Sequence, residues 1–304
     1  MASPPLSRKD IFRRFPWLAR QDQLMVLSAD VDGLLSATLL HHHLGWRVAG
    51  YYDCETLWLS QQGFEHRDQL VWIDLDIARP GLPSLGHHIL TLDDQVPPDL
   101  AHVCNPNLLA GIGVDRFTGK YPFSTLLFLL WLHEITLRRS LIARLLVLHA
   151  DSSWLNARRY GENCRAWQQR LPDYDWRWLF QQVASQQFQR RMEDQLHVRL
   201  ERLGIRRSAA DGKGQPAAQP GNQLGLNPDW DDDLILGLYD LAGTYLKWSP
   251  PQAPGMDHRL EGRRETAALR TVAPKGLPAW VKAEGVFSYA ITSRDTLNFT
   301  RLDW

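Results

Sequence analysis

The chain has 304 residues, enough for two domains of roughly 150 residues each or for one large domain. Its 34 Lys and Arg residues balance its 34 Asp and Glu residues, which argues against a wholly basic, histone-like nucleic-acid binder but not against a local basic groove. Hydrophobic residues make up 44% of the chain and charged residues 22%, values typical of globular proteins with a sizeable core.

Three cysteines without a Cys-x-x-Cys spacing favour reduced, buried thiols over a disulfide framework or a zinc ribbon. Residues 1–23 contain prolines and arginines but no long apolar run, so we expect no signal peptide. The longest apolar stretch, 126–132, is too short to cross a bilayer. We therefore expect a soluble, cytoplasmic protein without a membrane partner.

In the first half of the chain, short apolar runs alternate with helical patterns. Runs that are apolar throughout and separated by helices are typical of a parallel sheet covered on both faces. The predicted strands are 24–27, 48–52, 70–73 and 88–92. The predicted helices are 34–44, which stops at Gly45, and two buried helices at 123–138 and 140–149.

The second half is predicted to be rich in α-helix. A long amphipathic helix is expected at 176–203, a Gly- and Pro-rich linker at 206–228, a helix at 231–246, and a hairpin at 286–299 that turns at 293–295. The fold class is therefore α/β, with a parallel sheet flanked by helices in the N-terminal half and an α-rich C-terminal part that carries a small β-hairpin region. The expected domains are an α/β domain at 1–165, a connecting amphipathic helix at 166–207, a flexible linker at 208–228 and a smaller C-terminal domain at 229–304.

Carboxylates come directly after the predicted strands. They are Asp30 and Asp32 after the first strand, Asp74 and Asp76 after the third, Asp93 and Asp94 after the fourth, and Asp151 after the apolar run 145–149. Ligands of open parallel sheets bind outside the carboxyl ends of the strands, and clustered carboxylates need a cation to neutralise them. Hard oxygen ligands favour Mg²⁺ or Mn²⁺, which orients phosphate and activates water.

The alternative is that each of these aspartates caps a helix or begins a turn. Asp32 in particular could cap the helix that starts near Leu34. If the carboxylates instead crowd one metal site, Asp32→Ala should relieve repulsion, so the stability of the metal-free protein should hold or rise.

Four stretches resemble, in order and rough spacing, the motifs of the DHH phosphoesterase superfamily, especially its RecJ-like single-strand exonucleases. Residues 27–37 resemble the first motif, a strand followed by Asp-x-Asp-x-Asp-Gly-x-x-Ser, and residues 73–74 the second, a strand ending in Asp. Residues 89–95 followed by 101–107 resemble the third, Asp-His-His and then Asn-Pro-Asn. Residues 149–151 and 160–163 are similar to the fourth, Ala-Asp and then Gly-Glu-Asn-Arg, so the resemblance covers about 24–165.

The resemblance implies a divalent-metal phosphoesterase that acts on a phosphodiester of single-stranded nucleic acid or of a nucleotide. The implied site comprises Asp30, Asp32, Asp74 and Asp151 as ligands of Mn²⁺ or Mg²⁺, Asp93 as a catalytic ligand or water-positioning group, and Asn105, Asn107 and Arg294 as substrate-binding residues. Arg294 enters because residues 288–295 resemble a strand-plus-Arg-Ser hairpin of the family's smaller domain.

The chain departs from the family pattern at three positions. Ser28 replaces the leading Asp of the first motif, and Asp94 and Gln95 replace the two histidines of the third. His87 and His88 would lie about 15 Å away, at the other end of the predicted strand, so we expect them not to replace the lost pair. The alternative hypothesis is a catalytically degenerate subunit that binds nucleic acid or protein partners in a larger complex. A third hypothesis is a phosphohydrolase of a small molecule such as pyrophosphate.

Arginines and aromatic residues alternate in the stretch 158–207. With Trp167, Trp176, Trp178 and Phe180 between them, these arginines could form a stacking surface for single-stranded nucleic acid. The alternative is an amphipathic connecting helix whose aromatic residues belong to the core.

Overall fold

The computed structural model describes residues 4–203, 226–229 and 231–304, and the chain divides into two compact units. The first unit is assembled from Met1–Ser28, Leu44–Tyr121 and Pro254–Trp304, and the second from Ala29–His43 and Pro122–Ala253. Each unit thus combines distant stretches of the chain, whereas the boundaries drawn from the sequence cut it into consecutive pieces. Positions 208–225 of the linker expected at 208–228 lie outside the described residues.

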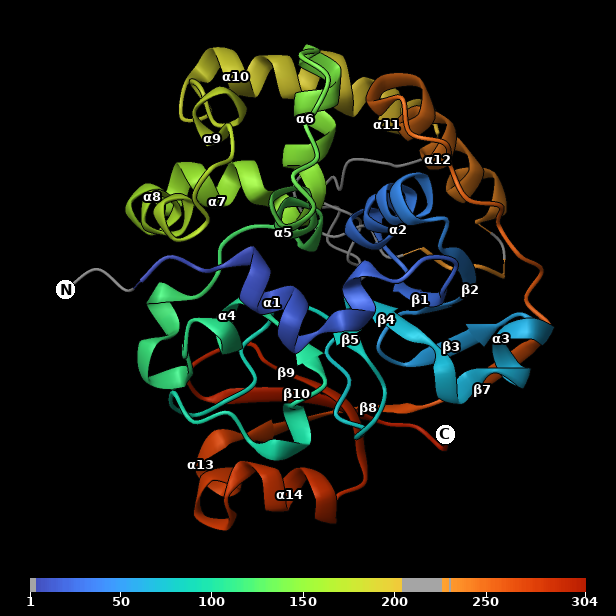
Figure 1. Ribbon diagram of the computed structural model, residues 1–304, viewed down its shortest axis with the longest axis vertical. Helices are drawn as coiled ribbons and strands as arrows, with labels where there is room; N and C mark the ends of the chain where they lie inside the picture. Colours follow the sequence, from blue (N-terminus) through green and yellow to red (C-terminus); the bar gives the residue numbers. More distant parts are fainter. Residues whose placement is uncertain (1–3, 204–225, 230) are drawn as a thin grey trace, which may run out of the picture. The chain divides into compact units, whose positions relative to one another are not determined.

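The first unit contains a seven-stranded, mostly parallel sheet in the order β6-β5-β4-β1-β2-β3-β7 (Figure 1). Its strands are β1 (Leu24–Ser28), β2 (Arg47–Tyr52), β3 (Thr56–Leu59), β4 (Val71–Ile73), β5 (Ser84–Leu85), β6 (Val103–Cys104) and β7 (His258–Glu261). All pairs from β6 to β2 are parallel, while β3 is antiparallel to both β2 and β7. The predicted α/β fold class is confirmed.

Three of the four predicted strands are confirmed as β1, β2 and β4, but the strand predicted at 88–92 is wrong. The strand beside β4 is β5, where Ser84 pairs with Trp72 on one side and Val103 on the other. The chain leaves the sheet after Leu85, and Ile89 forms only an isolated bridge, to Ile291. An apolar run therefore marks a packed segment here, not a strand of the sheet.

The C-terminal stretch of the first unit forms a three-stranded antiparallel sheet in the order β8-β10-β9. Its strands are β8 (Arg263–Ala268), β9 (Val286–Ile291) and β10 (Thr296–Arg301), and β9 with β10 confirms the predicted hairpin. Phe287 of β9 packs edge-on against Trp72 and Tyr52, and Trp304 packs against Trp72 and Phe287. The last fifty residues thus complete the core of the large sheet.

The remaining elements of the first unit are short. Its helices are α1 (Arg8–Arg14), α3 (Gln61–Glu65), α4 (Pro106–Leu109), α13 (Leu269–Val272) and α14 (Leu277–Ala283), with 3-10 turns η1 (Pro16–Ala19), η2 (Arg67–Gln69), η3 (Pro98–Leu100), η4 (Val114–Gly119) and η7 (Ala273–Lys275). Helix α3 packs against β2 and β3, where Gly63 has no room for a side chain because the carbonyl oxygen of Ala49 lies against it.

The second unit is helical. It contains α2 (Val31–Leu44), α5 (Thr125–Leu132), α6 (Leu141–His149), η5 (Ala150–Ser152), α7 (Ser153–Arg159), α8 (Gly161–Arg170), α9 (Trp176–Leu179), α10 (Gln186–Arg191), the π-helix η6 (Met192–His197), α11 (Val198–Arg202) and α12 (Asp232–Leu246). All eight residues of α5 are buried, and α6 packs against α7, η6 and α12. None of the helices in the described ranges has both the length and the apolar character needed to cross a membrane.

The continuous helix predicted at 176–203 is wrong, because α9 ends at Leu179 and a second capping residue, Ser185, begins a new helix. The Asp175 side chain accepts a hydrogen bond from the Trp178 backbone to begin α9, and the Ser185 side chain accepts one from Phe188 to begin α10. Such side-chain caps satisfy donors at a helix start and so favour a new helix over a continuous one. The helix at 123–138 is also shorter than predicted, since α5 ends at Leu132.

Two buried histidines meet inside the second unit. His149, at the end of α6, and His197, at the end of the π-helix, have ring centroids 5.4 Å apart and are 5% and 4% exposed. Within the described residues, Nδ1 of His149 has no hydrogen-bond partner. Burial, together with the neighbouring His197, lowers the pKa of His149 from 6.5 to about 3.

We expect this burial to make the protein less stable in acid. In the unfolded chain His149 takes up a proton near pH 6.5, whereas in the folded protein it stays neutral down to about pH 3. Stability is therefore full above pH 6.5, falls between pH 6.5 and 3, and changes no further from this group below pH 3. In urea unfolding at several pH values, His149→Leu should flatten this slope, while His66→Gln, at an exposed histidine, should leave it unchanged.

Candidate functional site

A buried carboxylate–imidazole pair lies at the carboxyl ends of adjacent parallel strands in the first unit. Asp74 directly follows β4 and His87 follows β5 by two residues. The Nδ1 atom of His87 lies 3.2 Å from Oδ1 of Asp74, and the two side chains are 6% and 1% exposed. The hydroxyl of Ser28, the last residue of β1, donates a hydrogen bond to Oδ2 of Asp74 (2.6 Å). Parallel pairing of β1, β4 and β5 thus brings three side chains together.

A second pair, Asp76 and His88, lies beside the first. Oδ2 of Asp76 accepts hydrogen bonds from the backbone N–H of His88 and contacts its Nδ1, both at 3.1 Å. The rings of His87 and His88 stack with centroids 4.7 Å apart, and the His88 side chain is 39% exposed while Asp76 is buried. A Cβ on Gly86 would lie 2.4 Å from Cγ of Asp76, so only glycine allows the chain to pass this carboxylate.

Two asparagines hold the histidine segment in place. The side-chain amide of Asn105 donates to Oδ1 of Asp76 (2.8 Å) and to the carbonyl of His88 (2.9 Å). The side-chain amide of Asn107 donates to the carbonyl of His87 (2.7 Å), while its Oδ1 accepts from the Tyr121 backbone. Both asparagines are fully buried, so their amides shape the site from within.

Strand β9 fixes the two loops that carry these pairs. The carbonyl of Phe287 accepts from the Ala78 backbone (2.7 Å), and the Ile291 N–H donates to the carbonyl of Ile89 (2.9 Å). Between them, the Tyr289 hydroxyl donates to the carbonyl of Leu90 (2.8 Å). The C-terminal sheet therefore closes over the segments that follow Asp76 and His88.

Asp74 and His87 are suited to hold a divalent cation. Together they offer carboxylate oxygen and imidazole nitrogen at one buried point. Carboxylates suit Mg²⁺ and Mn²⁺, and of these two ions the imidazole nitrogen favours Mn²⁺. Oδ1 of Asp74 and Nδ1 of His87 lie 3.2 Å apart, so both atoms could contact one ion, which would take the place of their hydrogen bond.

Two of the expected metal ligands, which belong to the second unit, cap helices there. Oδ1 of Asp30 accepts from the Gly33 backbone (2.9 Å) at the start of α2. Oδ2 of Asp32 accepts from the Thr125 N–H (2.7 Å) and its Oδ1 from the Leu126 N–H (3.0 Å), the first two residues of α5. Capping, which we considered as the alternative, is therefore present at both positions, but Asp30 and not Asp32 caps the helix α2. The roles of both as ligands stay predictions.

The remaining expected site residues are Asp151 of the second unit and Asp93 and Arg294 of the first. Asp151 follows the helix α6, not a strand, and is half-buried with φ of 44°. Asp93 is exposed, and its Oδ1 accepts from the Gln95 backbone in a turn (2.9 Å). Arg294 is exposed in the turn between β9 and β10.

The sequence interpretation missed His87 and His88, and the distance of about 15 Å expected for them is wrong. It followed from placing a strand at 88–92, which put the histidines at the amino end. In the structure they follow β5 and thus lie at the carboxyl end. Gly86 was the available signal, because a glycine directly before two histidines marks a close approach of the backbone to another group.

Comparison of the chain with models of known protein families, with curated proteins and with solved structures finds no match.

The capping geometry reverses our expectation for Asp32. Asp32→Ala leaves two buried N–H groups of α5 without their acceptor, so the free energy of unfolding should fall by about 1–3 kcal/mol. Chemical unfolding of the metal-free protein measures this, with Asp194→Ala, at an exposed carboxylate, as a control within about 0.5 kcal/mol of wild type. Unchanged or increased stability would show that relief of repulsion outweighs the lost caps.

Proposed function

We propose that the protein is a cytoplasmic, divalent-cation-dependent phosphoesterase that acts on a phosphodiester of a nucleic acid or nucleotide, with Mn²⁺ or Mg²⁺ as its cation. The observation that carries the proposal is the buried Asp74–His87 pair at the carboxyl ends of adjacent parallel strands, where open α/β sheets bind their ligands. The neighbouring pair of Asp76 and His88 supplies a half-exposed imidazole at the same place.

Asp74 and His87 would hold the cation, which when bound polarises a phosphoryl oxygen and lowers the pKa of water. Oδ1 of Asp74 and Nδ1 of His87 would contact the ion, and Ser28 fixes Oδ2 of Asp74. Asp76 orients His88 through Nδ1, which leaves Nε2 of His88 to take or give a proton. Burial of the carboxylates excludes water that would weaken these interactions.

The resemblance to DHH phosphoesterases supports this proposal in a shifted register. We propose that the two histidines of the third motif are His87 and His88, with Gly86 in place of the leading Asp. Asn105 would then be the first residue of the Asn-Pro-Asn that follows the histidines in the motif. It follows His88 by 17 positions, and its side-chain amide donates a hydrogen bond to the His88 carbonyl. In this register Asp94 and Gln95 no longer stand in place of the motif's two histidines, and Asp93 is no longer part of the motif.

This function predicts metal-dependent cleavage that requires His87. With labelled single-stranded DNA and RNA, cleavage in Mn²⁺ should stop in EDTA, and His87→Gln should lower the rate at least a hundredfold. Calorimetric titration of the protein with Mn²⁺ alone should show weaker binding by the same variant, because one ligand is removed. His66→Gln, at an exposed histidine of the same unit, should change neither. Cleavage that persists in EDTA, or wild-type rates in His87→Gln, would contradict the proposal.

A second candidate function, a catalytically degenerate binding subunit, is supported by Asp30 and Asp32. Their carboxylates are engaged in helix capping, and Ser28 offers a hydroxyl where the family has a carboxylate. Stable binding of nucleic acid or a protein partner, with no Mn²⁺-dependent cleavage of DNA, RNA or pyrophosphate, would favour this function over the first.

An exposed tyrosine among arginines supports single-stranded nucleic acid as the partner. Tyr160, between α7 and α8, is 49% exposed, and the guanidinium of Arg159 lies 5.3 Å from its ring centroid. In the described part of the chain, Arg159 and the exposed Arg165 form no ion pair with a carboxylate. By contrast Trp167 and Trp176, expected as stacking residues, are buried in the core.

Tyr160→Ala should weaken binding of a single-stranded oligonucleotide about tenfold or more, because base stacking contributes about 1–3 kcal/mol. Arg165→Gln should lower the slope of log affinity against log salt by about 1. Fluorescence anisotropy in EDTA measures binding without cleavage, with the exposed Arg264→Gln of β8 as a control for charge. Equal affinities for all variants would exclude this surface.

A further inference from the structure

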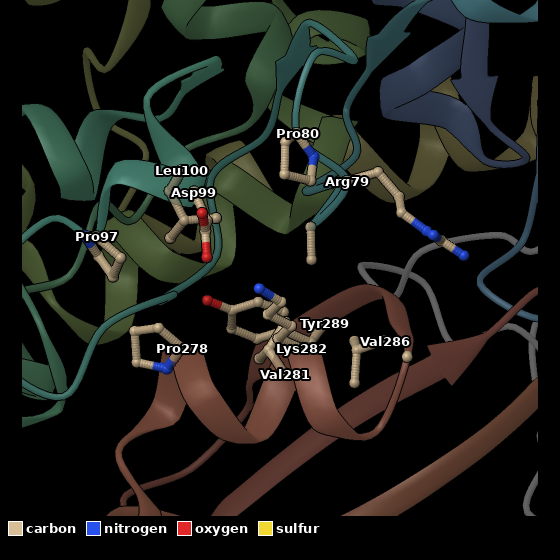
Figure 2. Close-up of a pocket in the computed structure, with 12 residues that line it drawn as sticks. Arg79, Pro80, Pro97, Asp99, Leu100, Pro278, Val281, Lys282, Val286 and Tyr289 are labelled. Atoms are coloured by element: carbon tan, nitrogen blue, oxygen red, sulfur yellow. The ribbon is translucent and has the colours of Figure 1, made fainter.

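A cavity of about 230 Å³ lies in the first unit, apart from the Asp–His pairs. Figure 2 shows it between helix α14 with the start of β9 on one side and the loops at 78–80 and 97–100 on the other. Pro80, Pro97, Pro278, Val281 and Val286 make much of its lining apolar.

Three charged residues, Arg79, Asp99 and Lys282, are part of this lining. Asp99 and Lys282 both line the cavity and are exposed, and neither forms an ion pair within residues 4–203, 226–229 and 231–304. In Figure 2 the carboxylate of Asp99 and the amino group of Lys282 face the cavity from opposite walls, while Arg79 extends away from them. The Tyr289 hydroxyl, which also lines the cavity, is already engaged with the carbonyl of Leu90.

We propose that this cavity binds a small zwitterion, an α-amino acid with an apolar side chain. The ligand's carboxylate would pair with Lys282 and its ammonium group with Asp99, while its side chain packs against the prolines and valines. A simple anion would meet the carboxylate of Asp99, and a simple cation would meet Lys282. Only a ligand that carries both charges satisfies both groups.

The size of the cavity supports the same class of ligand. Its volume of about 230 Å³ lies below the roughly 300–1,000 Å³ of sites for drug-sized ligands. Nucleotides and sugar phosphates carry two or more negative charges, which Lys282 would not balance beside Asp99. A small amino acid has the appropriate size and zero net charge.

Calorimetric titration of the full-length protein with L-leucine tests this inference. We expect saturable binding with a Kd of about 1 mM or below. Isoamylamine, which lacks the carboxylate, and 4-methylvalerate, which lacks the ammonium group, should each bind at least tenfold more weakly. Lys282→Met and Asp99→Asn should each weaken leucine binding at least tenfold, and because both side chains are exposed, circular dichroism should show an unchanged fold.

Lys275→Met and Asp295→Asn, which alter exposed charges outside the cavity, are the matched controls and should bind leucine as wild type does. The inference is overturned if leucine fails to bind, if the cavity variants bind it normally, or if the two analogues bind as tightly as leucine. None of these measurements depends on the cation or on cleavage.

Discussion

Burial of the Asp74 carboxylate is the constraint on which the rest of the first unit depends. A buried carboxylate is costly unless it is paired and hydrogen-bonded, and here His87 and Ser28 provide those partners. They meet because β5, β4 and β1 are parallel neighbours, which places the residues at the carboxyl ends of these strands along the same edge of the sheet. The surrounding features all fix the segment that carries the histidines: Gly86 lets the chain pass close to Asp76, and Asn105 and Asn107 hold its carbonyls.

The C-terminal sheet has two roles in this arrangement. Phe287 fills the core beneath the large sheet, while the backbone of β9 and the hydroxyl of Tyr289 hold the loops beyond Asp76 and His88. The first unit therefore needs residues from both ends of the chain, and a cut near residue 229 would remove part of its core. The same strand lines the cavity with Tyr289 and Val286, so one element serves both the Asp–His loops and the proposed amino-acid site.

Aspartates in similar sequence contexts have different physical roles in this protein. Asp30 and Asp32 accept backbone N–H groups at helix starts, whereas Asp74 and Asp76 orient imidazole rings. The first role stabilises structure, and the second is typical of groups that hold a cation or move a proton. The contrast explains why both an enzyme and a binding subunit are consistent with the same acidic pattern, and why the histidines, not the aspartates alone, distinguish them.

The sequence by itself determined the elements whose signals are local. Apolar runs and helical or alternating patterns were enough to predict the α/β class, β1, β2, β4, helices near α2, α6 and α12, and the hairpin of β9 and β10. The position of β5 was decided only by the tertiary structure, because a strand of two residues exists through its neighbours Trp72 and Val103 and not through its own pattern. The candidate site followed from that placement: moving the strand from 88–92 to Ser84–Leu85 takes His87 and His88 from the amino end to the carboxyl end. Which carboxylate each histidine meets is a long-range property, since strand pairing and not sequence spacing sets the distance between them.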